Sequence, residues 1–485
     1  MKNKTILIFK ILVATFFVLQ LFSCDDTLNT ETNSDGYIIV DNLKELSRLA
    51  AGDNQKIKLN PGVYTVNYKE FSDVYGFKLD TISETPADSV FFGAVLHFSG
   101  NGNKFDFTGT NIRISNKLLR SFGKNKVAEV LISGHDNHFE GLKVEDFGNI
   151  APKNGCSAVT LYIMGDRDTV DHADLYVCGS SPYGYGYLLG KGANPIYHHE
   201  KHSSLLIAGI GTRLFNSKIV THSYGHGIYL QGAVDTHIEG CYVEGKMRPT
   251  DEMLKETSGP AYSVDFRSVY PPGYIEKGKM IALSEDAYRA YPKGANGRCT
   301  KDIVIKNCVA KHMRAAFSFS LAYGDKPTIV EDCTEIECQS GFGVPNNGVI
   351  VGCKGDAAYG PVISFPYKKT HDCTIELTLI PTTSDFPPTR LIEVNGSNHE
   401  ITIYGEPGDI QKKQIPICFG ESSRADLAKF DDPTMDMRDA SGASNVHLVN
   451  KTGMPIILNE RTKNCTIESN GEVTDQGEGD IITKL

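Results

Sequence analysis

One short segment of the chain collects side chains that can transfer protons. The run Thr-His-Ser-Tyr-Gly-His-Gly contains His222, Tyr224 and His226. Lys246 and Arg248 follow 24 positions after His222 and Tyr224. Histidine and tyrosine serve as general acids and bases in enzymes, whereas lysine and arginine stabilise developing negative charge. These five residues form the candidate catalytic set.

That set assembles only if residues about 24 positions apart become neighbours in space, as stacked solenoid coils allow. Five segments place a serine or cysteine three positions after an apolar residue: Leu214–Ser217, Ile238–Cys241, Ile305–Cys308, Val330–Cys333 and Ile350–Cys353. Adjoining copies begin 24, 25 or 20 positions apart. Short β-branched strands separated by Gly, Asn and Asp turns at this spacing are typical of a solenoid. Stacked strands lie about 4.8 Å apart, so His222 and Lys246 should meet. The alternative is a solvated, basic turn edge.

From about residue 96 to the C-terminus, this repeat resembles that of the right-handed parallel β-helix superfamily, the pectate-lyase-like polysaccharide-active proteins. The resemblance implies an all-β fold, a right-handed parallel β-helix solenoid. It is specific for fold and weak for function. We expect Cys241, Cys308, Cys333 and Cys353 to point inward in aligned positions, because regular recurrence suits stacked interior thiols better than a disulfide framework.

A solenoid has open ends that need caps, and residues 41–51 are expected to supply the N-terminal one. This segment starts with Asp-Asn and continues with leucines at helical spacing, the pattern of a short capping helix. We expect one β-helix domain over residues 37–485, with inserted loops at about 178–204 and 245–300.

Insertions on a solenoid often carry the binding site. The substrate-binding candidates therefore come from these two segments: Tyr183, Tyr185, His199, His202 and Arg267. The tyrosines could line a sugar groove in a chain without tryptophan, or could pack within the loop. The histidines could join the catalytic cluster, or could lie in an exposed loop.

The overall charge narrows the ligand class. The chain has 49 Lys and Arg against 59 Asp and Glu, a net charge of −10, which argues against nucleic acid as a partner. A basic cluster on an acidic protein favours an anionic polysaccharide. We therefore predict a lyase that cleaves a uronic-acid-containing glycan by β-elimination. His226 or Tyr224 would act as base or acid, Lys246 and Arg248 would neutralise the carboxylate, and His222 would orient the others.

Two other functions fit the same scaffold. A non-catalytic surface glycan-binding lipoprotein would use the tyrosines alone. A glycoside hydrolase would use a carboxylate pair, chosen from Asp235, Glu239, Glu244, Asp251, Glu252, Asp265, Glu285 and Asp286. No cofactor is certain. The pairs Asp251-Glu252 and Glu285-Asp286 could coordinate Ca²⁺, or could be the first turn of a helix and a solvated loop.

The N-terminus has the pattern of a targeting signal. Residues 1–23 carry lysines and then a 12-residue apolar run, too short to span a bilayer and suited to a signal peptide. The sequence Leu-Phe-Ser before Cys24 resembles a bacterial lipobox, which implies cleavage before Cys24 and its lipidation. The alternative is an ordinary secretory signal. We expect a flexible tether over residues 24–36 and a bacterial cell-envelope location, lipid-anchored on the periplasmic or surface face of the outer membrane. That lipid would be the only membrane contact.

Replacing Cys24 with Ala removes the lipid acceptor, so the Cys24→Ala protein should move from the membrane fraction to the soluble fraction. Fractionation and immunoblotting of cells that express either form measure this. A Cys24→Ala protein that stays with membranes would show that another anchor exists.

Overall fold

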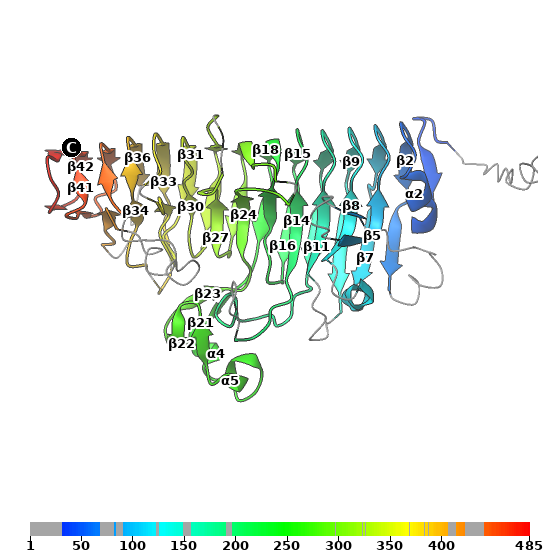
Figure 1. The fold of residues 1–485 in the computed structure, drawn as a ribbon, viewed down its shortest axis with the longest axis horizontal. Helices are drawn as coiled ribbons and strands as arrows, with labels where there is room; N and C mark the ends of the chain where they lie inside the picture. Colours follow the sequence, from blue (N-terminus) through cyan, green and yellow to red (C-terminus); the bar gives the residue numbers. More distant parts are fainter. Residues whose placement is uncertain are drawn as a thin grey trace, which may run out of the picture.

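The computed structural model is an elongated β-helix, in which short parallel strands wind coil upon coil along one axis (Figure 1). It describes residues 32–67, 82–83, 91–122, 126–148, 157–190, 196–295, 297–322, 324, 326–367, 369–382, 384–386, 388–405, 414–421 and 441–485. Two sheets dominate, one of 23 strands and one of 14 strands. The prediction of an all-β parallel solenoid is confirmed.

The 23-stranded sheet, called sheet A, contains β1 (Ile38–Val40), β2 (Lys56–Leu59), β3 (Gly62–Val66), β6 (Lys104–Asp106), β7 (Thr110–Ser115), β9 (His138–Glu140), β10 (Lys143–Phe147), β12 (Thr169–Asp171), β13 (Asp174–Val177), β15 (Arg213–Phe215), β16 (Lys218–Thr221), β18 (Val234–Glu239), β19 (Tyr242–Glu244), β25 (Lys301–Lys306), β26 (Val309–Lys311), β28 (Ile329–Glu331), β29 (Thr334–Ile336), β31 (Val349–Gly355), β33 (Thr374–Leu379), β36 (Glu400–Gly405), β39 (His447–Asn450), β42 (Thr466–Ser469) and β44 (Ile481–Lys484). The 14-stranded sheet, called sheet B, contains β4 (Ile82–Ser83), β5 (Phe91–Phe98), β8 (Lys126–Ile132), β11 (Ala158–Ile163), β14 (His202–Ile207), β17 (Ile228–Gln231), β24 (Asp286–Tyr291), β27 (Ala315–Ser318), β30 (Phe342–Gly343), β32 (Ile363–Ser364), β34 (Ile392–Val394), β37 (Ile417–Phe419), β40 (Ile456–Leu458) and β43 (Val473–Asp475).

The remaining elements are short. Three small sheets pair β20 (Met247–Pro249) with β23 (Met280–Ala282), β21 (Arg267–Val269) with β22 (Pro272–Tyr274), and β35 (Gly396–Ser397) with β38 (Ala443–Ser444) and β41 (Thr462–Lys463). The helices are α2 (Leu43–Leu49), the 3₁₀-helix η1 (Asn116–Phe122), α4 (Thr250–Met253) and α5 (Pro260–Ser263).

One coil consists of two strands in sheet A followed by one strand in sheet B. After β15 and β16 the chain crosses to β17 and returns to sheet A as β18. In the next coil β18 pairs with β15 and β19 pairs with β16, both in parallel. Lys218 lies opposite Tyr242, 24 residues later. The repeat length seen in the sequence is therefore the length of this coil.

The tight turn between the two sheet A strands explains the recurring Gly, Asn and Asp. Asn216, Gly240, Asn307, Asp332 and Gly352 all have positive φ, between 47° and 67°. Only glycine adopts this conformation without steric cost, and asparagine and aspartate tolerate it better than other residues. Each of these residues comes directly before the serine or cysteine of its repeat, so the turn fixes where that side chain enters the core.

The four predicted interior cysteines form a ladder through the core. Cys241, Cys308, Cys333 and Cys353 are each at most 1% exposed, and all four are free thiols. The residues that follow them are paired from coil to coil along β19, β26, β29 and β31. The inward, aligned placement is confirmed. Beside the ladder, the rings of Tyr288, Phe317 and Phe342 stack at centroid distances of 4.8 and 5.0 Å.

The N-terminal cap is also confirmed. Asn42 caps α2 by accepting the backbone N–H of Glu45 at 2.9 Å. The buried face of α2 consists of Leu43, Leu46 and Leu49. One strand precedes this helix, because β1 pairs in parallel with β2. The β-helix thus begins before α2.

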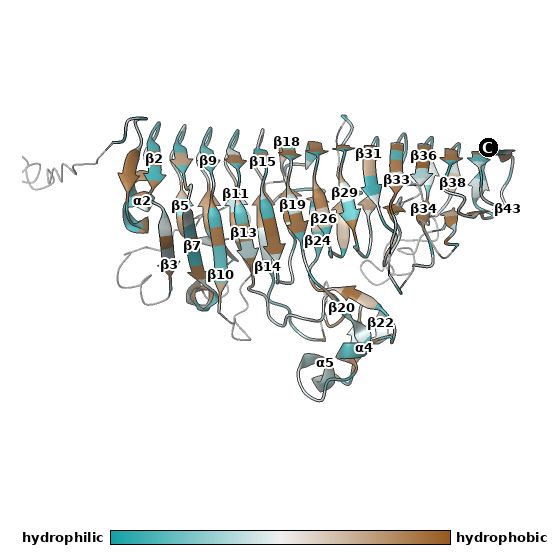
Figure 2. Ribbon diagram, turned by 180° about the vertical axis from the view of Figure 1, so that it is seen from behind, coloured by the Kyte–Doolittle hydropathy of each residue, from teal (hydrophilic) through white to brown (hydrophobic). Residues whose placement is uncertain are grey.

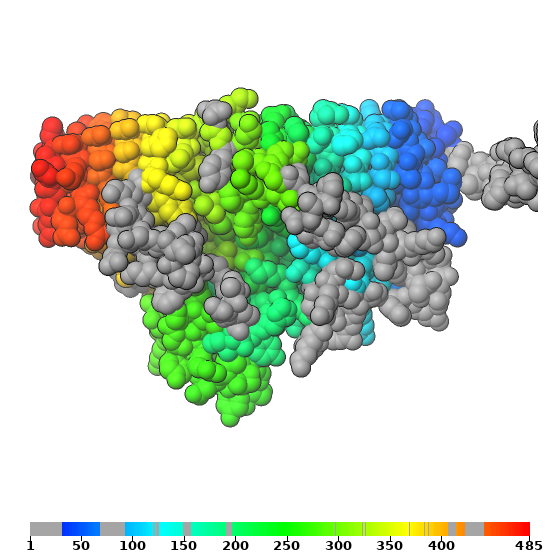
Figure 3. Space-filling view, viewed as in Figure 1, coloured from blue at the N-terminus to red at the C-terminus, as the bar shows by residue number. Residues whose placement is uncertain are grey.

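Two excursions leave the coils at the same corner, where the chain passes from sheet A to sheet B. The first lies between β13 and β14, and the second between β19 and β24. They contain the predicted segments 178–204 and 245–300 except for the last residues of each. These belong to β14 in the first segment, and to β24 and the turn after it in the second. The excursions pack together through their own apolar cluster, whose buried members include Leu188, Leu189 and Met253. Figure 3 shows this unit protruding from the side of the solenoid.

Hydropathy follows the coil geometry. Figure 2 shows brown, hydrophobic bands within the strands and teal, hydrophilic residues at many of the turns. The lipobox, Cys24 and most of the predicted tether lie outside the described residues. Among the residues that the structure does describe, no helix has the length and apolar character needed to cross a bilayer.

Burial of the cysteine ladder predicts slow chemical modification. In the native protein, a thiol reagent should label Cys241, Cys308, Cys333 and Cys353 slowly, and rapidly only after unfolding, because reaction requires an accessible thiolate. Mass spectrometry after timed labelling in buffer and in denaturant measures this. Half-exposed Cys299 provides the internal comparison. Rapid native labelling of the four, or disulfides among them, would contradict the ladder.

Candidate functional site

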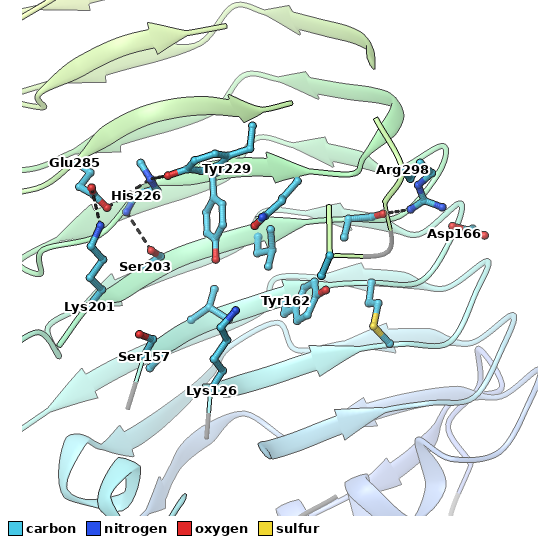
Figure 4. A pocket seen from close by; sticks show the side chains of 18 of the residues that line it. Lys126, Ser157, Tyr162, Asp166, Lys201, Ser203, His226, Tyr229, Glu285 and Arg298 are labelled. Carbon is cyan, nitrogen blue, oxygen red and sulfur yellow. Dashed lines mark hydrogen bonds and ion pairs between the residues drawn. The ribbon is translucent and has the colours of Figure 1, made fainter. Parts of the chain in front are cut away.

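A groove of about 510 Å³ lies on the outer face of sheet B (Figure 4). Strands β8, β11, β14, β17 and β24 supply its floor. Along β11 and β14, Leu161 and Leu205 point into the core. The alternating neighbours, Tyr162 and Leu206, belong to a second apolar cluster on the opposite face. The groove thus has an apolar floor on the side of the sheet that faces away from the core, as a ligand-binding surface requires.

Cationic side chains stand around this floor. Lys126 begins β8, and Lys201 directly precedes β14. In Figure 4 both lie on the same side as His226 and Glu285, whereas Arg298 and Asp166 lie at the other end of the groove. The groove thus combines an apolar floor with three cationic side chains and with the carboxylates of Glu285 and Asp166.

His226 is the best-defined proton carrier in the groove. Its Nε2 lies 2.8 Å from Tyr291 Oη and 3.4 Å from Glu285 Oε2. Its Nδ1 accepts the backbone N–H of Asp286 at 3.3 Å, so the neutral ring carries its proton on Nε2. Burial lowers the pKa of His226 to about 4, which keeps the ring neutral near pH 7. Burial also raises the pKa of Tyr291 to about 12, so the phenol keeps its proton.

A buried network of ion pairs lies beside His226 and Tyr291. Glu285 contacts Lys201 at 2.9 Å and Arg314 at 3.3 Å. Asp286 contacts Arg314 at 2.9 Å and Arg289 at 3.1 Å. Burial by itself would raise the pKa of both carboxyl groups, but the surrounding cations lower the pKa of each. Both therefore stay ionised. Lys201 and Arg314 contact Glu285 Oε1, whereas Glu285 Oε2 faces His226.

The structure divides the predicted catalytic set. His226 lies in the groove. Tyr224 is 1% exposed and lies beneath the surface, where its ring contacts the His199 ring at 4.8 Å and the Lys201 ammonium at 5.1 Å. Burial raises its pKa well above the usual value. Tyr224 therefore supports Lys201 and does not line the groove.

His222 and Lys246 meet as the coil period predicted, but elsewhere. Val220 lies opposite Glu244 at the ends of β16 and β19, so the two side chains follow on neighbouring coils. His222 Nδ1 lies 2.9 Å from Tyr176 Oη. Burial lowers the pKa of His222, with a further contribution from Lys246. Neither residue lines the groove.

Arg248 has a structural role in the projecting unit. Its guanidinium contacts Glu256 at 2.7 Å, donates to the Gly184 carbonyl at 3.1 Å and lies 5.6 Å from the Tyr185 ring. Tyr185 donates to the same Glu256 carboxylate at 2.9 Å. Arg248 therefore joins the two excursions, and its predicted role in neutralising a substrate carboxylate is corrected.

The predicted substrate-binding residues also lie away from the groove floor. Tyr183 packs against the apolar cluster of the projecting unit. Arg267 donates to the Val264 carbonyl at 3.1 Å within β21 and its preceding turn. His199 packs on Tyr224, and burial lowers its pKa to about 4. His202 is fully buried on β14 and points into the solenoid interior. The expectation of an exposed histidine loop is wrong for His202, because β14 begins there.

The alternative carboxylates are also accounted for. Asp251 and Glu252 form the first turn of α4, the structural alternative stated above. Glu285 and Asp286 are occupied by Lys and Arg side chains, which leaves no oxygen-rich cage of the kind Ca²⁺ uses. Glu244 accepts a hydrogen bond from Tyr242 at 2.8 Å and does not line the groove.

Sequence reasoning missed the other groove residues: Lys126, Tyr162, Lys201, Tyr229, Tyr291 and Arg298. Tyr229 lies in the Ile-Tyr-Leu run of β17, directly after the His226 segment, and its outward position could have been read from alternation. Tyr291 pairs with Gln231 across β17 and β24, yet it lies 60 residues further along the chain. The second excursion hides this relationship from any fixed period.

No protein-family model matches this sequence, and no curated protein matches it. Among solved structures, a PL6 alginate lyase in complex with a trisaccharide is 10% identical, with 93% of this chain and 85% of that chain covered and a TM-score of 0.41. The endo-xylogalacturonan hydrolase from Aspergillus tubingensis is 9% identical, with 92% and 90% covered and a TM-score of 0.35. A periplasmic alginate epimerase is 10% identical, with 88% and 86% covered and a TM-score of 0.35. These similarities assign no activity to this chain.

The buried neutral state of His226 makes its contribution to stability depend on pH. The folded pKa of about 4 lies below the unfolded value of about 6.5. Between these values the unfolded chain binds more protons, so this contribution is complete above pH 6.5 and is lost as pH falls toward 4. The free energy of unfolding of wild type relative to His226→Gln should fall by about 3 kcal/mol over that window. Denaturant titrations at a series of pH values test this, and parallel pH curves for the two proteins would contradict it.

Proposed function

We propose that the protein is a polysaccharide lyase that cleaves a uronic-acid-containing glycan by β-elimination in the sheet B groove. One observation carries the proposal: a neutral His226 hydrogen-bonded to Tyr291 at 2.8 Å lies in a groove that also holds Lys126, Lys201 and Arg298. Proton transfer and carboxylate neutralisation are the two requirements of this elimination.

The elimination breaks the C5–H and C4–O4 bonds and forms a C4=C5 double bond. Tyr291 keeps its proton at neutral pH and would donate it to the departing O4. The Nε2–H of His226 holds the Tyr291 oxygen in place at 2.8 Å, and proton exchange with solvent would restore the phenol. Lys126 lines the same groove and, as an uncharged amine, would accept the C5 proton. Lys201, fixed by Glu285 at 2.9 Å, would stabilise the charge that develops on the carboxylate.

The floor supports a sugar substrate. Tyr162 on β11 and Tyr229 on β17 lie on either side of Leu206, their paired residue on the intervening strand β14. Aromatic rings of this kind pack against the apolar faces of sugars. In a chain without tryptophan, these tyrosines would supply the stacking surface.

Hydrolysis has less support from this groove. A glycosidase needs a protonated carboxyl group as its general acid and a second carboxylate nearby. The pKa of Glu285 is well below its usual value because cations outweigh the effect of burial, so Glu285 cannot supply the proton. Asp166, the other groove carboxyl, lies at the opposite end (Figure 4).

The proposal also places this activity at the bacterial envelope. Lipidation at Cys24 would hold the β-helix at the bacterial envelope, where extracellular polysaccharides are available. The protein has a net charge of −10, so most of its surface would repel an acidic polymer. The cationic side chains of the groove would be the place that attracts it.

Tyr291→Phe and His226→Ala should each lower kcat by about 10²–10⁴, because each removes a proton-transfer group. His222→Ala is the matched control: it removes a histidine outside the groove and should leave turnover near wild type. A panel of acidic and neutral glycans is monitored for ultraviolet absorbance of the unsaturated product and for reducing ends.

Both signals rising together for the wild type supports a lyase. Reducing ends alone would establish a hydrolase, and binding without either signal would establish a glycan-binding protein. Full activity of both groove variants would place the reaction elsewhere.

A further inference from the structure

The interior of the solenoid holds a polar cluster on the opposite side of sheet B from the groove. Glu129 on β8, Asp146 on β10 and His202 on β14 are each at most 1% exposed. His202 occupies a core position, since its partner across the sheet is Ala158, and Ala158 in turn pairs with Val127. Two acids and an imidazole thus replace apolar side chains in the packed interior.

The three side chains lie close together, and the two carboxylates face different nitrogens of the imidazole ring. Asp146 Oδ2 lies 3.6 Å from His202 Nδ1, and Glu129 Oε2 lies 3.8 Å from His202 Nε2. One ligand atom from each residue lies within 4.8 Å of those of the other two. Separations near 4 Å are the span of two ligands on an ion with bonds of about 2.0–2.2 Å.

Several of these buried atoms lack hydrogen bonds within the described part of the chain. Neither Glu129 oxygen, nor Asp146 Oδ1, nor His202 Nδ1 has a hydrogen-bond partner there. Thr160 Oγ1 lies 3.0 Å from His202 Nε2, a contact of the kind that orients a metal-binding imidazole. A buried polar atom without a partner costs about 1–3 kcal/mol, so this cluster needs something to complete it.

We propose that Glu129, Asp146 and His202 form a structural site for a divalent transition-metal ion of the Zn²⁺ type. One imidazole nitrogen and two carboxylates are ligands that Zn²⁺ accepts. Ca²⁺ fits less well, because it takes six to eight oxygen ligands and avoids imidazole. The ion would also supply the positive charge that two buried carboxylates require.

The site would act on the groove through β14. Lys201 and Ser203 flank His202 in sequence, and both line the groove. Lys201 contacts Glu285, and Ser203 Oγ accepts the backbone N–H of His226 at 3.2 Å. An ion that fixes His202 from inside would fix the start of the strand that positions these two groove residues. The site itself does not depend on the activity proposed above.

Metal content tests the proposal without any substrate. The wild-type protein is incubated with Zn²⁺, freed of excess metal by gel filtration and analysed by inductively coupled plasma mass spectrometry. We expect one zinc per chain. Saturating Zn²⁺ should raise Tm by at least about 5 °C over protein treated with a chelator, and Ca²⁺ should not. Wild-type protein without bound zinc and without a Tm shift overturns the proposal.

Variants locate the ion. Glu129→Gln and His202→Asn should abolish zinc retention and the Tm shift. The control is His172→Asn, which alters a solvent-exposed triad of the same donor types, with Glu140 and Asp171. This control should retain one zinc per chain. Retention by the interior variants, or its loss in His172→Asn alone, would overturn the assignment. The wild-type measurement decides the case if an interior variant fails to fold.

Discussion

Backbone hydrogen bonding between successive coils is the constraint on which this molecule depends. Apart from the antiparallel pair β4–β5, the strands of sheets A and B pair in parallel from coil to coil. A slip of one residue would move every inward side chain outward. The register survives a large interruption: Val243 lies opposite Ala310, 67 residues later. The second excursion leaves and re-enters at one corner, so the length it adds does not disturb the ladder. Residues on either side of it can therefore build one surface.

Because the register is kept from coil to coil, residues at the same position of successive coils stack in columns. The cysteine ladder is an inward column, in which a small, apolar thiol fills the same slot in four successive coils. The groove is made from outward columns of sheet B, in which Tyr162, Leu206, Tyr229 and Arg289 occupy paired positions. Binding surface and core are thus two faces of the same strands. A change that alters strand packing inside will reach the groove outside.

Buried charged side chains gather at the corner where the chain passes from sheet A to sheet B. Both excursions, the Glu285–Arg314 network and the interior cluster around His202 lie close to it. Burying charge there is expensive unless each charge is paired, and Arg314 satisfies both Glu285 and Asp286. That network holds His226 and Tyr291 in a fixed orientation, which general acid–base catalysis requires.

The sequence by itself determined the solenoid, its coil length, the cysteine ladder and the capping helix. These features depend on local rules: turns that need positive φ select Asn216 or Gly240, and alternation sorts inward from outward residues. It also identified the segment that carries His226. Only the tertiary structure decided the partners of His226. Tyr291 and Glu285 reach it across an excursion whose length follows no period, and Lys126 comes from three coils earlier in sheet B. The fate of Tyr224, Arg248 and His202 was likewise decided by packing. Tyr224 supports Lys201, Arg248 joins the two excursions, and His202 lies in the interior. The sequence could not show these roles, because burial depends on contacts between distant segments.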